Sequence, residues 1–80
     1  MKENIEPTAR QLEILLLLDS GMTHLEAAVK TGISCNTVHS HMGSLYLITG
    51  ISNVRGSVRV LVQRGILYRD AEDKLHVVKK

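Results

Sequence analysis

The sequence contains a single cysteine, Cys35, and no hydrophobic run close to the length of a membrane span. One cysteine excludes an internal disulfide and a zinc site built from cysteines, and it favours a reducing, cytoplasmic setting. A membrane-spanning helix needs about 20 apolar residues, whereas the ILLLL run is flanked by Glu13 and Asp19. Because Met1 to Pro7 is polar and acidic, we also expect no signal peptide and no membrane partner.

The groups that an enzyme needs are also missing from the sequence. We find no nucleophile paired with a base, no paired carboxylates and no phosphate-binding glycine loop, so we expect neither an enzyme nor a cofactor. His39 and His41 lie two apart on a predicted helix and diverge, so a metal site would need a distant third ligand, and we expect none. We interpret His41 as a half-buried structural residue and His24 and His76 as solvated. Cys35 lies at a helix start, a position that suits redox sensing, but we prefer an inert thiol.

Positive charge is concentrated in the C-terminal part of the chain. Residues 1–50 carry three basic and five acidic side chains, a net charge of −2, whereas residues 51–80 carry seven basic and three acidic ones, a net charge of +4. Such a charge run on a small domain is usually a solvated face, but it also attracts phosphate. Any attraction to nucleic acid must therefore come mostly from the C-terminal third.

The segment from Met22 to Ile48 has the pattern of a helix, a sharp turn and a second helix. Thr23 can cap the first helix, with Glu26 completing a capping box. Gly32 can take the left-handed conformation that ends it, and Ser34 can cap the second helix, which runs from about Cys35 to Ile48. We interpret the segment as a DNA-reading helix-turn-helix.

Three residues carry the packing argument for this motif. Two helices that cross over a short turn need a small residue at the crossing, a flexible one in the bend and a branched one below. Ala28, Gly32 and Val38 meet these needs at compatible spacing.

Three further elements are predicted around the motif. A helix capped by Thr8 runs to about Asp19, a helix capped by Ser52 or Asn53 runs to about Arg64, and two short extended stretches then suggest a hairpin or wing. The expected fold class is mainly α, a four-helix helix-turn-helix domain with a small C-terminal β-hairpin. We divide the chain into a flexible N-terminal arm (1–7), the helix-turn-helix domain (8–67) and a hairpin with a basic tail packed on the same domain (68–80).

Helical spacing predicts which side chains face the core. In the first helix we expect Ile14, Leu15, Leu17 and Leu18 to face inward and Leu12 and Leu16 to fall outside this stripe. In the last helix the expected stripe is Val54, Val58, Leu61 and Val62, and the hairpin is expected to pack through Ile66, Leu67, Leu75 or Val77.

The face of the 35–48 helix opposite its core residues carries Asn36, His39, Ser40 and Gly43. Small polar side chains there permit close approach to a groove. Gly43 costs the helix about 1 kcal/mol relative to alanine, a cost that either function or tight packing would justify.

The chain from Thr8 to Leu67 matches a known family pattern over 60 residues without a gap. The run GIS, followed by TV and then His41, is fairly specific, although each piece alone would be weak. These residues resemble the LuxR/GerE-type DNA-binding domain, and we expect a stand-alone version with a hairpin extension. The matching residues are Thr8, Arg10, Glu13, Leu15, Leu17, Leu18, Gly21, Glu26, Ala28, Gly32, Ile33, Ser34, Thr37, Val38, His41, Gly50, Ser52, Asn53 and Val58.

The resemblance implies a transcription regulator that binds double-stranded DNA, with its third helix in the major groove and a homodimer formed through its fourth helix. Carried over to this chain, Thr37 contacts phosphate, and His39, Ser40 and Gly43 occupy base-facing positions. The complete DNA-binding set that we predict is Thr23, Asn36, Thr37, His39, Ser40, Gly43, Arg55 and Arg59.

The departures from the family pattern concern charge and apolar surface. The helix from about Cys35 to Ile48, which the resemblance places in the major groove, contains no Lys or Arg. Each phosphate neutralised contributes roughly one unit to the salt slope of binding, so this absence predicts weak or partner-dependent DNA affinity. Four leucines occupy positions that the family pattern predicts to be exposed to solvent: Leu12, Leu16, Leu25 and Leu47. An apolar cluster of this kind indicates an interface with a protein partner.

Two alternatives stay open at this point. The TGIS sequence occurs at Thr31 and again at Thr49, and the second copy resembles the start of a winged-helix unit that would place Arg55 and Arg59 in the groove. This winged-helix interpretation places Tyr46 where the helix crossing needs a small residue and Gly56 where it needs a branched one. The helix-turn-helix at Met22 to Ile48 therefore packs better. The other alternative is a helix-turn-helix-derived module that binds or antagonises another regulator through its apolar surface.

Overall fold

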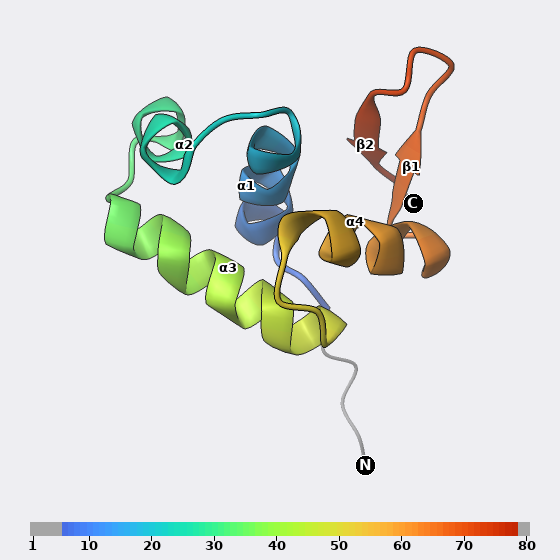
Figure 1. Cartoon of the computed structure of the whole chain (residues 1–80), viewed down its shortest axis with the longest axis horizontal. Helices are drawn as coiled ribbons and strands as arrows, with labels where there is room; N and C mark the ends of the chain where they lie inside the picture. The colour runs from blue at the N-terminus through green and yellow to red at the C-terminus, as the bar shows by residue number, and fades with distance from the viewer. Residues whose placement is uncertain (1–5, 79–80) are drawn as a thin grey trace.

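In the computed structural model, which describes residues 6–78, four helices are followed by a two-stranded antiparallel sheet (Figure 1). The expected fold class is therefore confirmed. The expected flexible arm falls mostly on residues 1–5, outside the described part of the chain. The elements are α1 (Ala9–Asp19), α2 (His24–Thr31), α3 (Cys35–Thr49), α4 (Val54–Gln63), β1 (Leu67–Arg69) and β2 (Leu75–Val77).

Side-chain caps set where the helices begin. Thr8 and Gln11 form a capping box at α1, and Thr23 and Glu26 form the expected one at α2. Each box satisfies two backbone N–H groups that the first turn of a helix leaves without a partner. Ser34 caps α3 as expected, and Asn53 caps α4 through a bond to the N–H of Gly56.

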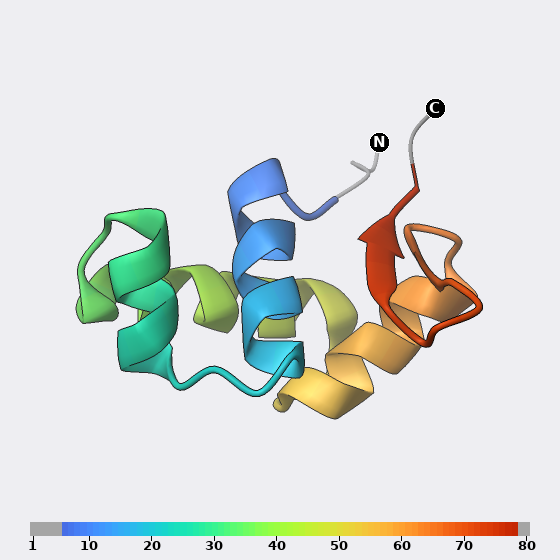
Figure 2. The same cartoon turned by 90° about the horizontal axis from the view of Figure 1, so that it is seen from above.

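Helix α1 lies in the middle of the molecule (Figure 2). It packs against α2, α3, α4 and β2, and Ile14 and Leu15 on it are fully buried. The prediction that Leu12 lies outside the core was wrong, because its side chain is only 7% exposed. Elements surround α1 on several sides, so its buried face is wider than one amphipathic stripe. Leu16 and Leu17 are both partly buried at the edge of the same core, so the predicted distinction between them is also wrong.

Helix α4 buries Ser57, Val58 and Leu61. Val62, predicted to complete this stripe, is 39% exposed, so that prediction was wrong. Val62 lies one turn beyond Val58, on the part of the helix that borders a surface groove rather than the core.

The hairpin packs on α4 and α1. Leu67 is its main anchor, with 1% exposure, and Leu75 and Val77 pack against the same core as expected. In the register of the sheet Leu67 pairs with Val77 and Tyr68 with His76.

The hairpin turn is organised by Asp70. Its carboxylate accepts bonds from the N–H groups of Glu72 and Lys74, and it lies 2.7 Å from Nε2 of His76. The hydrogen bond with His76, followed by the one from Lys74, lowers the pKa of Asp70 from 3.8 to about 2. The prediction of a solvated His76 is therefore correct only in part, because its side chain is 42% exposed but bonded to Asp70.

Among residues 6–78, no helix has both the length and the apolar character that crossing a bilayer requires.

Candidate nucleic-acid interface

The corner between α2 and α3 has the predicted construction. Gly32 adopts a left-handed conformation, with φ of 77°, and its N–H bonds to the carbonyls of Ala28 and Val29. Ala28 is 4% exposed and Val38 of α3 is fully buried. The small residue, the flexible residue and the branched residue therefore lie where the crossing needs them, and they hold α3 at a defined angle to α2.

The outer face of α3 brings together four of the predicted site residues. Asn36, His39, Ser40 and Gly43 are all exposed, and their spacing along the helix places them on one side. Thr37 is half-buried at the edge of this face, with its hydroxyl 2.9 Å from that of Ser34. The free face of α3 is thus polar, small and, among these residues, without Lys or Arg.

Gly43 has no structural need to be glycine. Apart from its chain neighbours and the backbone of its own helix, a Cβ atom built on it meets no atom within 4 Å, so tight packing against other elements of residues 6–78 does not account for its cost to the helix. Of the two explanations that the sequence left open, packing against another element of the described chain therefore has no support.

His39 is not isolated on this face, because its ring stacks on that of His24 at the start of α2. The ring centroids are 4.3 Å apart and the planes differ by 7°. His24 was predicted to be solvated, and the structure instead shows it half-buried against His39. No periodic sequence signal could reveal this contact, because it depends on how α2 crosses α3.

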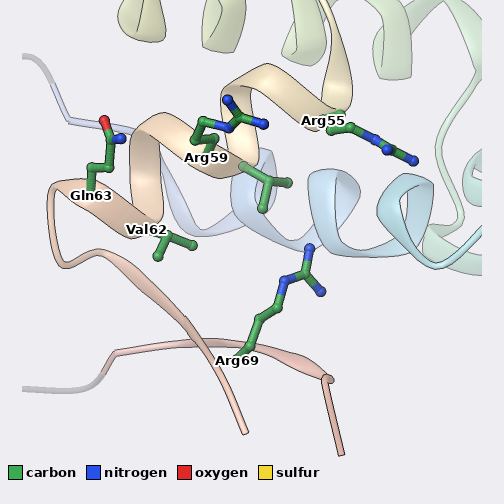
Figure 3. Close-up of a pocket in the computed structure, with 6 residues that line it drawn as sticks. Arg55, Arg59, Val62, Gln63 and Arg69 are labelled. Atoms are coloured by element: carbon green, nitrogen blue, oxygen red, sulfur yellow. The ribbon is translucent and has the colours of Figure 1, made fainter.

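Arg55 and Arg59 lie on a different surface. With Val58, Val62 and Gln63 of α4 and Arg69 of β1 they line a shallow groove of about 290 Å³ between α4 and the hairpin (Figure 3). Arg55 points away from the other two arginines in this view, so the three guanidinium groups do not converge on one point. Such a spread arrangement suits an extended anion better than a small one.

The charges in this groove are unequally balanced. Arg69 lies 3.6 Å from Asp19 and 3.8 Å from Asp73. Arg55 and Arg59 form no ion pair with any of residues 6–78. These two side chains therefore provide most of the unbalanced positive charge of the groove.

The structure does not bring the arginines onto the face of α3. No residue of α3 lines the groove, and α3 lies on the side of α4 away from the hairpin (Figures 1 and 3). Seven of the eight predicted site residues therefore form two surfaces, one on α3 and one on α4, and the eighth, Thr23, is exposed at the start of α2, which it caps.

The predicted leucine surface is smaller than expected. Leu12 belongs to the core and Leu16 is partly buried, so neither contributes to an exposed patch. Leu25 is 64% exposed and Leu47 is 86% exposed. Leu25 has an exposed neighbour in Val29, one turn further along α2, whereas Leu47 lies in the last turn of α3, away from α2 (Figure 1).

The groups of residues that bind metals do not occur in the described range. Among residues 6–78, no cluster of three or more His, Cys, Asp or Glu side chains could hold a metal ion. Cys35 is half-buried at the start of α3.

Comparison with known proteins places the corner and its flanking helices in a known class. Residues 8–60 match the bacterial regulatory proteins of the luxR family. Over 46 residues the chain is 50% identical to a protein of Hyphomicrobium methylovorum named probable transcriptional regulatory protein SgaR, a match that covers 58% of this chain and 22% of that protein. Over 60 residues it is 33% identical to the transcriptional activator protein EsaR of Pantoea stewartii subsp. stewartii, covering 75% and 24% respectively. The chain thus spans less than a quarter of each of these relatives, and no solved structure matches it.

Proposed function

Because the chain belongs to the luxR family of bacterial regulatory proteins, a family of DNA-binding helix-turn-helix proteins, we propose that it is a sequence-specific regulator whose α3 enters the major groove. The observation that carries this proposal is the outer face of α3, where four small or polar residues are exposed together and Gly43 has no packing role. A helix that presents such a face fits the width of the major groove.

Each residue of this face has a defined role in the proposal. The amide of Asn36 can bond adenine at two positions, and the imidazole of His39 and the hydroxyl of Ser40 can bond base edges. Gly43 lets the backbone of α3 come close to the DNA. Thr37, at the edge of the face, contacts a phosphate.

Thr23 is proposed to contact a second phosphate from the start of α2. Its side-chain oxygen accepts a bond from the N–H of Glu26, which leaves its own O–H free to donate. A helix N-terminus favours an anion because its first N–H groups and its dipole both point toward it.

The affinity for the DNA backbone is proposed to come from Arg55 and Arg59. The face of α3 lacks Lys and Arg, whereas these two arginines are exposed and unpaired among residues 6–78. Phosphate neutralisation supplies much of the affinity of DNA-binding proteins. The backbone of the bound duplex would therefore pass along the groove of α4.

We propose that the protein dimerises on DNA through α4. This contact is what membership of the luxR family implies. The side of α4 that carries Arg55 and Arg59 is assigned to the DNA backbone, so the proposed dimer contact lies elsewhere on the helix.

Duplex binding measured across a range of salt concentrations tests the proposal. We expect Arg55→Ala and Arg59→Ala each to lower the salt slope by about 0.9 and to weaken all duplexes alike. Arg64→Ala is the matched control, because Arg64 is an exposed arginine next to α4 that does not line the groove. His39→Ala should relax the preference at one base pair without changing the salt slope.

Three outcomes would contradict this placement. Folded protein that binds no duplex at low salt would remove the proposed function. Equal effects of the three arginine variants would remove the role of the groove. A changed base preference in Arg55→Ala, with none in His39→Ala, would instead favour the winged-helix alternative, in which α4 reads the DNA beside the hairpin.

A second candidate function is a protein-interaction module. The observation that favours it is the exposed pair Leu25 and Val29 on α2, which are 64% and 76% exposed. Apolar side chains gathered on one helix face often mark a protein interface. Absence of duplex binding by folded protein at low salt would favour this second function.

A further inference from the structure

The stack between His24 and His39 joins the start of α2 to the exposed face of α3 that is proposed to read DNA. The rings are nearly parallel, at 7°, with centroids 4.3 Å apart. Within residues 6–78 the other stacked pair, Tyr68 and His76, lies in the hairpin. The His24–His39 pair is thus a ring contact between α2 and a residue of the proposed reading face.

An exposed histidine on a helix ordinarily samples several side-chain rotamers. Stacking against a half-buried ring restricts His39 to orientations in which its plane is parallel to that of His24. The ring nitrogens lie in that plane, so they remain free at the edge of the stack while one face of the ring is covered. A hydrogen bond to a base edge requires this kind of in-plane presentation.

We propose that His24 is a positioning residue for base reading: it holds the imidazole of His39 in the orientation that contacts a base edge. This inference rests on the proposed function, in which His39 faces the major groove. His24 acts through His39 and makes no base contact of its own. Preorganised contacts bind better because less side-chain freedom is lost on binding.

Two substitutions at position 24 separate stacking from other roles. His24→Ala removes the ring, whereas His24→Phe keeps a flat ring that stacks but cannot donate or accept a hydrogen bond. Neither disturbs the cap of α2, because Thr23 and Glu26 make it. Leu25→Ala is the matched control, a truncation at the adjacent exposed residue, which takes no part in the stack.

The experiment selects preferred duplexes from a randomised pool with the wild-type protein and then measures binding to that duplex and to single-base variants of it. We expect His24→Ala to reduce the preference at the base pair read by His39 by roughly threefold to tenfold, part of the discrimination that one side-chain contact supplies. His24→Phe should restore the preference, and Leu25→Ala should keep it. In His39→Ala the further change His24→Ala should have no effect on this base pair, because the orientation it sets no longer matters.

Other outcomes would overturn the inference without overturning the proposed function. If His39→Ala relaxes the preference but His24→Ala does not, His39 reads DNA without help from His24. If His24→Ala weakens all duplexes equally, His24 is a backbone contact. Failure of the wild-type protein to bind any duplex would instead be a failure of the proposed function. Thermal unfolding of each variant, with an unchanged midpoint expected, excludes loss of folding as the cause.

Discussion

Replacing Gly43 by alanine is expected to stabilise the fold and to weaken DNA binding. Gly43 lies in the interior of α3 on its exposed face, and a Cβ there meets no atom within 4 Å. Glycine in a helix interior costs about 1 kcal/mol relative to alanine, mainly through backbone entropy. The substitution should therefore recover about 1 kcal/mol, which raises the unfolding midpoint of a domain of this size by roughly 4–8 °C.

Gly56 provides the matched comparison, because it also lies in a helix but in a different environment. A Cβ built on it overlaps Cγ2 of Ile51 and lies 3.0 Å from Oδ1 of Asn53, the cap of α4. The Cγ2 atom is attached directly to Cβ of Ile51, so it can move away only by a change of the restricted χ1 rotamer of this β-branched residue or by a shift of its backbone. Overpacking of this kind costs about 1–3 kcal/mol, so Gly56→Ala should lose stability although its helix propensity improves.

Two assays on Gly43→Ala and Gly56→Ala, one of stability and one of duplex binding, test these predictions. Urea or thermal denaturation should move the midpoint up in Gly43→Ala and down in Gly56→Ala. Duplex binding should weaken about tenfold in Gly43→Ala, because an added methyl group at a close contact costs about 1–3 kcal/mol. If both variants shift stability in the same direction, the packing argument is refuted. If Gly43→Ala is stabilised but binds DNA like the wild type, Gly43 does not lie at the DNA surface.

Two further predictions concern buried and turn hydrogen bonds. The buried hydroxyls of Thr49 and Ser57 lie 2.9 Å apart and connect the end of α3 to α4, and the Thr49 hydroxyl also accepts a bond from the N–H of Ile51. Thr49→Val should lower the free energy of unfolding, measured in urea, by about 1–3 kcal/mol, and Thr49→Ser should lower it less. Equal stability of Thr49→Val and the wild type would contradict this role. Because the pKa of Asp70 is lowered to about 2, its contribution to the hairpin is fully present above its ordinary value of 3.8 and is lost as the pH falls toward 2. Amide chemical shifts of the hairpin, followed from pH 6 to pH 2, should show this transition in the wild type, and its persistence in Asp70→Asn would refute the assignment.

The local features of the fold could be predicted from the sequence because neighbouring residues determine them. Thr23 and Glu26 meet within one helical turn, and Gly32 needs only its own backbone freedom to end α2. The same is true of the hairpin, where the turn is built from residues that lie close together in the chain. The corner and its exposed face on α3 followed from these local signals.

The predictions that were wrong concern side chains whose burial depends on contacts between elements distant in the sequence. Leu12 was placed outside the core because a single stripe was assumed for α1, whereas several elements surround this helix. Val62 was placed inside, because nothing in the periodicity of α4 shows that a groove with the hairpin begins there. The His24–His39 stack and the gathering of Arg59 and Arg69 at one groove likewise arise only from the crossing of packed elements.

The separation of the two candidate surfaces has a consequence for how this domain would bind DNA. Base discrimination would come from α3, which has polar edges but no Lys or Arg on its free face, whereas attraction to the backbone would come from Arg55 and Arg59 on α4. Base contacts carry sequence information and phosphate contacts carry most of the salt dependence. Because α3 would supply the base contacts and α4 the phosphate contacts, a change in the charge of the α4 groove would alter the affinity for every DNA sequence equally. The preference among sequences would remain with α3 and with the ring that supports His39.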